Sequence, residues 1–320
     1  MGKDKLRKFR ENETFRCLLQ PATSEVLNCD HSLKGNWNRD FFGNDNPIVV
    51  ELGCGKGDYT IDLAERNPSF NYIGIDIKGA RLWKGAKYAE EHGLKNVGFL
   101  RTRIEFIESI FAPGEVAEIW ITFADPQIGR EKKRLTAPLF MNRYRNFLKP
   151  GGIVHLKTDS RYLHEYSRAM AEQNSLEILA CATDIYGADR ERLYESGLSS
   201  LCGRAAVDAL FEVQTFYESQ YLAQGFPITY LAFLADKKIS GETGCNRFFG
   251  DYTAKGKNLT FTNVGSTRMM CPQMAFENAV LEAINGTAQY TLAGDTMALK
   301  DKDGNIIARC FFRGNVVRHF

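Results

Sequence analysis

The chain has 320 residues, of which 44% are hydrophobic and 25% charged, and its formal net charge is +2. Such a composition is typical of soluble globular proteins, and the length suggests two domains or one large domain with an appendage. No stretch approaches the roughly 20 apolar residues of a membrane span, which argues against a transmembrane helix. The low net charge excludes a polycation, so any nucleic-acid surface must depend on clustered basic residues.

The N-terminus and the cysteines indicate the compartment. The basic N-terminus MGKDKLRKFR has no apolar core behind it, so we expect no signal peptide and a cytoplasmic location. The eight cysteines are scattered without a CxxC pair, which predicts free thiols and no zinc site. His92, His155 and His164 carry no acid or nucleophile motif, so we interpret them as structural and expect no metal.

Residues 1 to about 46 are polar, and we expect them to be irregular. From there short apolar runs alternate with amphipathic segments. Strands are expected at 48–52, 72–76, 97–100, 118–123 and 153–157, and helices at 59–65, 80–91, 104–111, 138–148 and 161–172. Runs at 176–182 and 228–235 can complete the sheet, and 205–214 is a further expected helix. This alternation predicts an α/β fold with a doubly wound, mostly parallel sheet.

The character of the sequence changes near residue 239. Residues 240–320 are rich in Gly, Asn and Thr and contain short alternating runs at 259–262 and 289–292. The segment DKDGN at 301–305 predicts a hairpin turn between strands at 297–300 and 306–309, and 274–285 is one amphipathic helix. We therefore divide the chain into an α/β domain, 1–237, and a β-rich module with one helix, 238–320.

A glycine loop and an acid mark a candidate nucleoside site. The segment ELGCGKG at 51–57 follows a predicted strand and opens a helix, where glycines let the backbone approach a ligand. Its GxGxG spacing differs from the dinucleotide pattern and suits S-adenosylmethionine, which has no pyrophosphate. Asp76 ends the next strand, where an acid can accept hydrogen bonds from ribose hydroxyls. A tight turn and a helix N-cap are the alternative explanations, but the two features together favour nucleoside binding.

A second acid ends the fourth strand. Asp125 lies in FADPQ, where a carboxylate can stand beside a sulfonium or accept hydrogen bonds from a guanine; a turn-forming Asp-Pro is the alternative. Arg130, Lys132, Lys133 and Arg134 follow closely. A basic run is usually a solvated face, but this one adjoins the candidate reaction centre and favours contact with an RNA backbone. A second basic cluster lies within residues 3–10.

Taken together, these motifs resemble the bacterial tRNA (guanine-N7)-methyltransferases over about residues 1–235. The matching segments are ELGCGKG at 51–57, GID at 74–76, FADP through KKRLT at 123–136, LKPGG at 148–152, TD at 158–159 and TFYE at 215–218. The resemblance implies a Rossmann-like class I methyltransferase fold and transfer of a methyl group from S-adenosylmethionine to guanine N7 in tRNA, in the variable loop.

The resemblance also implies roles for individual residues. Asp125 is the expected catalytic residue. The cofactor would be bound by Glu51, Gly53, Gly55, Gly57, Asp76, Arg103, Ile104 and Asp125. The substrate would be bound by Gly129, Arg130, Lys133, Arg134, Asp159, Thr215, Phe216, Tyr217 and Glu218. Thr215 and Glu218 would close over the nucleotide, while Phe216 or Tyr217 would stack on a base or pack in the core. Family members occur as monomers and dimers, which leaves the oligomeric state open.

Three positions depart from the family pattern. Arg103 stands where the family often has Asp, so the backbone of Ile104 is the expected contact for the adenine. Ala124 replaces a proline, and Gly129 replaces a lysine, with Arg130 beside it. These departures concern the contacts with the adenine and the guanosine rather than the reaction class.

Residues 240–320 resemble a different family, the META (heat-shock lipoprotein-like) domain. The matching segments are TGCNRF at 243–248, GDY at 250–252, LTF at 259–261, STRMMC at 266–271 and GDT at 294–296. The usual opening strands of that domain are missing, so 228–238 serves both modules of a natural fusion or the reading frames are joined. Two other functions stay open: a class I methyltransferase with another substrate, and a non-catalytic envelope or binding protein.

Overall fold

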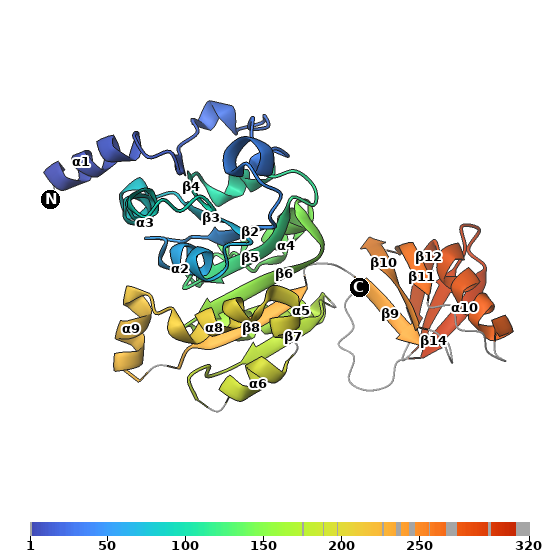
Figure 1. Ribbon diagram of the computed structural model, residues 1–320. Helices are drawn as coiled ribbons and strands as arrows, with labels where there is room; N and C mark the ends of the chain where they lie inside the picture. Colours follow the sequence, from blue (N-terminus) through green and yellow to red (C-terminus); the bar gives the residue numbers. More distant parts are fainter. Residues whose placement is uncertain are drawn as a thin grey trace. The chain divides into compact units, whose positions relative to one another are not determined.

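The computed structural model describes residues 2–174, 176–187, 189–196, 198–225, 227–234, 238–242, 247–255, 257–266, 274–293 and 296–311. The chain forms two compact units, one of residues 1–171 and 177–235 and the other of residues 172–176 and 236–320 (Figure 1). Each unit contains its own sheet. Among the described helices, none combines the length and the apolar character needed to cross a bilayer.

The first unit is built on an eight-stranded sheet with the order β1-β4-β3-β2-β5-β6-β8-β7. The strands are β1 (Leu18–Leu19), β2 (Ile48–Leu52), β3 (Asn71–Asp76), β4 (Val97–Arg101), β5 (Val116–Thr122), β6 (Leu148–Thr158), β7 (Ile178–Ala182) and β8 (Thr229–Leu234). Strands β1 to β6 are parallel, and β8 runs antiparallel between β6 and β7. The predicted doubly wound, mostly parallel sheet is confirmed.

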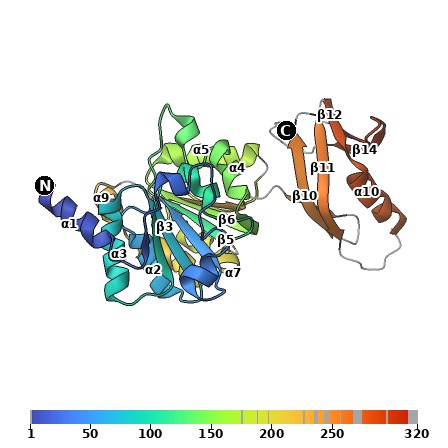
Figure 2. The same cartoon turned by 90° about the horizontal axis from the view of Figure 1, so that it is seen from above.

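Helices cover both faces of this sheet. The main ones are α2 (Asp58–Arg66), α3 (Gly79–Glu91), α4 (Pro138–Arg145), α5 (Arg161–Gln173) and α8 (Arg204–Glu212). Three shorter helices, α6 (Arg190–Glu195), α7 (Leu198–Cys202) and α9 (Phe216–Ala223), also lie between β7 and β8 in the chain. Helices α2 and α3 lie on one face and α4 and α5 on the other (Figure 2). Every residue of β2 is buried, as expected for a parallel strand enclosed by helices. Its carboxyl end opens onto the loops after the strands, the edge at which open α/β sheets bind ligands.

The N-terminal segment differs from the sequence prediction. Residues 1–46 were expected to be irregular, but they contain α1 (Gly2–Asn12), β1 and a π-helix, η2 (Trp37–Phe42). Helix α1 packs against α3, where the cationic groups of Arg7 and Lys8 lie over the ring of Trp83 and its indole N–H donates to Glu11 at 2.6 Å. A charged helix of this length depends on such docking, which its own sequence does not reveal.

Two predicted helices have different limits. Residues 104–111 were expected to form a helix, and the structure has a 3₁₀ helix, η3 (Ile104–Ser109). The helix expected at 138–148 ends at Arg145 instead. Strand β6 begins at Leu148, and Val116 pairs with Leu148 while Glu118 pairs with Ile153, so the segment 149–152 forms a bulge within β6.

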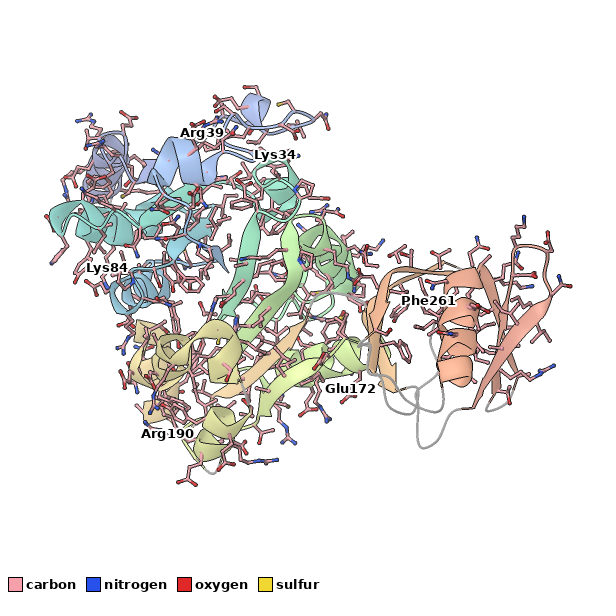
Figure 3. The ribbon with its side chains drawn as sticks, turned by 45° about the vertical axis from the view of Figure 1, so that its right-hand side comes forward. Lys34, Arg39, Lys84, Glu172, Arg190 and Phe261 are labelled. Carbon is pink, nitrogen blue, oxygen red and sulfur yellow. The ribbon has the colours of Figure 1, made fainter. Side chains whose placement is uncertain are left out.

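The second unit is a six-stranded antiparallel sheet in the order β14-β13-β12-β11-β10-β9. Its elements are β9 (Lys238–Glu242), β10 (Arg247–Lys255), β11 (Asn258–Ser266), α10 (Met274–Gly286), β12 (Gln289–Ala293), β13 (Thr296–Lys300) and β14 (Ile306–Phe311). The predicted helix and hairpin are confirmed. Leu259, Tyr290 and Leu299 form a small buried cluster against which Phe261 packs (Figure 3).

The two sheets do not share a strand in the described part of the chain. Strand β8 is hydrogen-bonded on both sides within the first sheet, whereas β9 pairs with β10 in the second. In the described residues, 229–234 therefore belong to the first sheet and 238–242 to the second. The META-like segments 243–246, 267–271 and 294–295 lie outside the described residues. Six cysteines are free thiols, at positions 17, 29, 54, 181, 202 and 310; Cys245 and Cys271 also lie outside the described residues.

Candidate active site

The glycine loop joins β2 to α2. Gly53, Gly55 and Gly57 have φ angles of +76°, +59° and +77°, in the left-handed region that favours glycine. A Cβ atom at Gly57 would lie 2.6 Å from the ring of Phe99, so this glycine is required for packing. Nothing lies within 4 Å of a Cβ atom built on Gly53 or Gly55. The first two glycines therefore leave open space over the backbone, where a ligand can approach.

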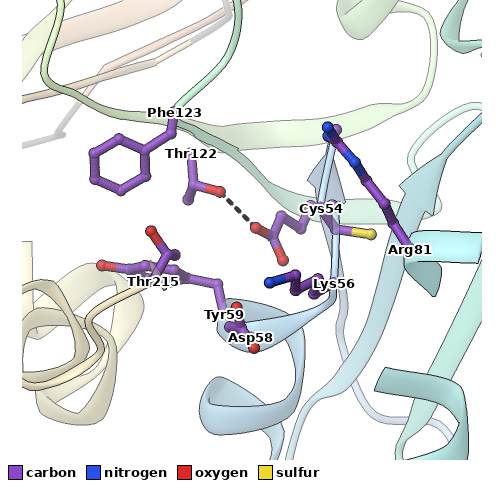
Figure 4. A pocket seen from close by; sticks show the side chains of 11 residues that line it. Cys54, Lys56, Asp58, Tyr59, Arg81, Thr122, Phe123 and Thr215 are labelled. Carbon is purple, nitrogen blue, oxygen red and sulfur yellow. Dashed lines mark hydrogen bonds between the residues drawn. The ribbon is translucent and has the colours of Figure 1, made fainter. Parts of the chain in front are cut away.

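Glu51 is a buried carboxylate beneath this loop. One of its oxygens accepts hydrogen bonds from the backbone N–H and the hydroxyl of Thr60, at 2.9 and 2.5 Å. The other accepts from the Thr122 hydroxyl at 2.5 Å (Figure 4). Burial raises the pKa of Glu51 to about 7, although the hydrogen bonds from the two threonines oppose this shift. A carboxylate held in this way suits a cationic ligand group, which would favour its ionised form.

Asp76 ties the glycine loop to the end of β3. Its carboxylate accepts hydrogen bonds from the backbone N–H of Gly55 at 3.0 Å and from that of Lys78 at 2.7 Å. The second contact caps the turn into α3. Each carboxylate oxygen keeps a further lone pair for a ligand hydroxyl. Asp76 thus holds the turn between β3 and α3 and also lies on a pocket wall, whereas the N-cap of α3 is Lys78.

Two pockets open along the carboxyl ends of β2 to β5, and they share Gly53, Arg81 and Phe123 as walls. The glycine-loop pocket is further lined by Glu51, Cys54, Gly55, Lys56, Asp58, Tyr59, Thr122 and Thr215. The Asp125 pocket is further lined by Asp76, Ile77, Lys78, Thr102, Arg103, Ile104, Glu105, Ala124, Asp125, Gln127, Lys133, Leu135 and Phe140. The structure therefore brings most of the expected cofactor residues onto two adjoining walls, whereas Gly57 lies elsewhere.

Arg81 is a pocket residue that sequence reasoning missed. It lies in the first turns of α3 and faces both pockets, opposite the side from which Thr215 approaches (Figure 4). Within the described residues its guanidinium has neither a hydrogen-bond partner nor an ion-pair partner. The only available signal was its place five residues after Asp76, because the helix after β3 begins at the same sheet edge.

Asp125 lies on a tightly bent loop after β5. Phe123 and Gln127 both have a φ of +49°, which is uncommon for residues with a side chain. The Asp125 carboxylate accepts a hydrogen bond from the backbone N–H of Gln127 at 2.9 Å and remains exposed. The loop thus presents an exposed carboxylate at the wall of the Asp125 pocket.

Arg134 holds this loop from the inside. Its Nε donates to the carbonyl oxygen of Pro126 at 2.9 Å and an Nη donates to the hydroxyl of Tyr162 at 3.0 Å. Its guanidinium lies 3.9 Å from the ring centroid of Tyr166. Only 2% of Arg134 is exposed, so its guanidinium is not available to the RNA backbone that the sequence assigned to it. The structure corrects that assignment because the 3₁₀ turn at 131–133 directs Arg134 inward.

The other residues expected to bind substrate lie in different surroundings. Gly129, Arg130 and Lys133 are exposed on the loop after Asp125, and Lys133 lines the Asp125 pocket. Asp159 follows β6 at the same sheet edge but lines neither pocket; it is half-buried, and burial raises the pKa of its carboxyl. The predictions for the side chains of Phe216 and Tyr217 lie outside what the structure describes.

Thr215 and Glu218 begin α9 and have unlike positions. Thr215 lines the glycine-loop pocket. Glu218 is completely buried, and its carboxylate is paired with Lys157 of β6. The structure therefore does not bring the Glu218 carboxylate to the surface on which a nucleotide would close.

Comparison with known proteins relates both parts of the chain to families. Residues 45–193 match a family described as "Putative methyltransferase", and residues 211–310 match the META domain. A tRNA (guanine-N(7)-)-methyltransferase of Christiangramia forsetii is 51% identical over 234 residues, which cover 72% of this chain and 98% of that protein. One from Bacteroides thetaiotaomicron is 46% identical over 233 residues, covering 73% of this chain and 86% of that protein.

The META match begins further upstream than the motifs in 240–320 indicated. It starts at residue 211 and so includes α9 and β8, which belong to the first unit. The resemblance of the second unit to this domain therefore extends into a segment that the first sheet uses for its own completion.

Proposed function

The chain belongs to the tRNA (guanine-N(7)-)-methyltransferase family, and we propose that it transfers the methyl group of S-adenosylmethionine to N7 of a guanine in the variable loop of tRNA. The observation that carries this proposal is the meeting of two pockets at Gly53, Arg81 and Phe123, with the glycine loop on one side and Asp125 on the other. A methyl donor and a base must meet at such a junction. Because tRNA is the substrate, we place the protein in the cytoplasm.

The residues of the two pockets suit S-adenosylmethionine, which supplies an electrophilic methyl group on a sulfonium. Gly53 and Gly55 leave space over their backbone, and the buried carboxylate of Glu51 suits a cationic group. Asp76 offers carboxylate oxygens to ribose hydroxyls. Arg103 and Ile104, after β4, lie on the wall assigned to the adenine.

The chemistry at N7 requires positioning more than proton transfer. Guanine N7 carries a lone pair and no proton, so its attack on the methyl group needs no strong base. The new N–C bond forms as the C–S bond breaks, and the positive charge passes from sulfur to the guanine. Asp125 can accept hydrogen bonds from the N1–H or N2–H groups of the base and favours the positive charge beside it. Asp125 is therefore the assigned catalytic residue.

Basic side chains near Asp125 are assigned to the RNA backbone. Arg130 and Lys133 are exposed on the loop after Asp125, and Lys132 lies between them in sequence. Phosphate contacts of this kind hold the tRNA in register but do not identify the base. Asp159, from the neighbouring strand end, remains the proposed additional contact to the guanosine.

The direct test is methyl transfer from labelled S-adenosylmethionine to unmodified tRNA transcripts, followed by nucleoside mass analysis. We expect 7-methylguanosine with the wild-type protein and a loss of at least a hundredfold with Asp125→Ala. Glu165→Gln, which removes an exposed carboxylate on α5, is the matched control. Cofactor binding without methylation of any tRNA would point to a methyltransferase with another substrate.

We further assign two domains, 1–237 and 238–320, with the second an accessory module. Each unit has its own sheet, which supports independent folding. Limited proteolysis of the whole chain should release a stable fragment that begins near residue 240. Degradation of both parts together would contradict the two-domain assignment.

A further inference from the structure

A buried ion pair lies beneath the glycine-loop pocket. Lys157, the penultimate residue of β6, and Glu218, in the first turn of α9, are both completely buried, and Nζ lies 2.5 Å from a carboxylate oxygen. Removing two charged groups from water costs several kcal/mol for each, so such a pair is weak evidence of added stability. Its position next to the pocket suggests a different role.

Lys157 joins β6 to two helices. Its ammonium group donates to the hydroxyl of Tyr59 on α2 and to the carbonyl oxygens of Leu210 and Val213 at the end of α8, at 2.8 and 3.3 Å for the carbonyls. An ammonium group has three N–H donors, and these partners together with Glu218 occupy all of them. Burial lowers the pKa of Lys157 to about 8, while Glu218 opposes that shift. Lys157 is thus hydrogen-bonded to α2 and to the end of α8 and is paired with α9.

Glu218 extends this network to the start of α9. It accepts a hydrogen bond from the hydroxyl of Tyr186 at 2.8 Å and another from the backbone N–H of Thr215 at 3.3 Å. The Thr215 hydroxyl in turn accepts from the backbone N–H of Glu218 at 3.2 Å, which completes a capping box. Both oxygens of Glu218 are therefore used within the protein.

Two members of the network line the pocket, Tyr59 and Thr215, and Thr215 is the one that contacts Glu218. It lines the glycine-loop pocket together with Glu51 and Gly53. Its hydroxyl oxygen accepts from Glu218, and its hydroxyl proton has no acceptor among the described residues. A threonine held in this way can donate a hydrogen bond to an acceptor on a bound ligand.

We propose that Lys157 and Glu218 are positioning residues that hold the Thr215 hydroxyl in the glycine-loop pocket, and that Glu218 makes no contact with the guanosine. This inference rests on the proposed function, because it takes the glycine-loop pocket to hold the methionine part of S-adenosylmethionine. It changes the role of Glu218 from closing over the nucleotide to orienting a cofactor contact. Lys157, which no sequence motif indicated, is part of the same network.

The test compares Lys157→Met, Glu218→Gln and the double variant Lys157→Met/Glu218→Gln in the full-length protein. Methionine keeps the volume of the lysine stem, and glutamine keeps the capping box while removing the charge. Arg168→Gln removes an exposed ion pair with Glu165 on α5 and is the matched control. Melting temperature, the Kd for S-adenosylmethionine by calorimetry, and kcat/KM for tRNA are measured for each.

Each single variant leaves a buried charge without its partner. We expect each to lower the melting temperature by roughly 10 °C and to weaken binding of S-adenosylmethionine about tenfold. The double variant leaves no unpaired charge, so it should recover most of the melting temperature, come within about threefold of wild-type affinity, and recover kcat/KM for tRNA with it.

Two results would overturn the proposal. A double variant that is stable and binds S-adenosylmethionine, but keeps the low kcat/KM of Glu218→Gln, would place Glu218 on the substrate. If the single variants fold and bind S-adenosylmethionine with wild-type affinity, the ion pair does not position Thr215 in the pocket. If the wild-type protein neither binds S-adenosylmethionine nor methylates tRNA, the proposed function fails instead, while the melting temperatures still report on the ion pair itself.

Discussion

The raised pKa of the buried carboxyl group of Glu51 leads to a quantitative prediction of how the stability of the protein changes with pH. In the protein without ligand its pKa lies at about 7 instead of 4.5, because burial penalises the ionised form. The folded protein therefore holds this proton to higher pH than the unfolded chain does. Stability associated with Glu51 is highest at acid pH and falls as the pH rises from about 4.5 to about 7. Over this pH range the contribution of Glu51 to the free energy of unfolding falls by about 3 kcal/mol.

Glu51→Gln isolates this effect. Glutamine can still accept from Thr60 and can donate to the Thr122 hydroxyl, so the hydrogen bonds of the site are retained. Between pH 5 and pH 8 the wild-type protein should lose about 2 to 3 kcal/mol relative to the variant. For a unit of this size that is a relative decline of about 5 to 10 °C in melting temperature.

The assay is thermal unfolding of both proteins without ligand at several pH values from 5 to 8, with Glu191→Gln, which alters an exposed carboxylate on α6, as control. The variant should also bind S-adenosylmethionine more weakly at pH 8, so the two effects have opposite signs. Melting temperatures of wild type and Glu51→Gln that change in parallel with pH would refute the reasoning, because they would mean that Glu51 titrates normally in the folded protein.

Three further predictions concern the loops around the site. Arg134→Ala should lower kcat by about tenfold through the loop it holds at Pro126, with an unchanged salt dependence of tRNA binding; a weaker salt dependence alone would mean that Arg134 contacts phosphate. Gly57→Ala adds a methyl group that meets the ring of Phe99, and it should destabilise the protein by about 2 to 4 kcal/mol in denaturant unfolding. Gly43→Ala, where only the positive φ is strained, should destabilise it less, and equal losses would contradict the packing argument. Arg81→Gln should weaken binding of S-adenosylmethionine about tenfold, because it removes a guanidinium that can pair with the carboxylate of this ligand. Binding of the decarboxylated analogue should be unchanged, and equal losses with both ligands would exclude a carboxylate contact.

Much of the first unit could be predicted because its signals are local. A buried run such as Ile48–Leu52, followed by glycines and then an amphipathic segment, predicts a parallel strand and its helix wherever it occurs. The carboxyl ends of parallel strands meet at one edge, so Glu51, Asp76 and Asp125 could be assigned to one site because each lies at or near the end of a predicted strand. Helix α1 could not be predicted in this way, because its stability depends on Trp83, far along the chain.

The sequence by itself determined the alternation of strands and helices, the glycine loop and the position of the acids at strand ends, since these follow from short-range periodicity and turn chemistry. Only the tertiary structure decided which charged side chains face solvent. Lys133 and Arg134 are neighbours, yet one lines a pocket and the other is buried against Tyr166. Glu218 and Lys157 are distant in sequence, and their pairing arises because α9 begins beside the end of β6. Burial and long-range contact are properties of the packed chain, and no local pattern specifies them.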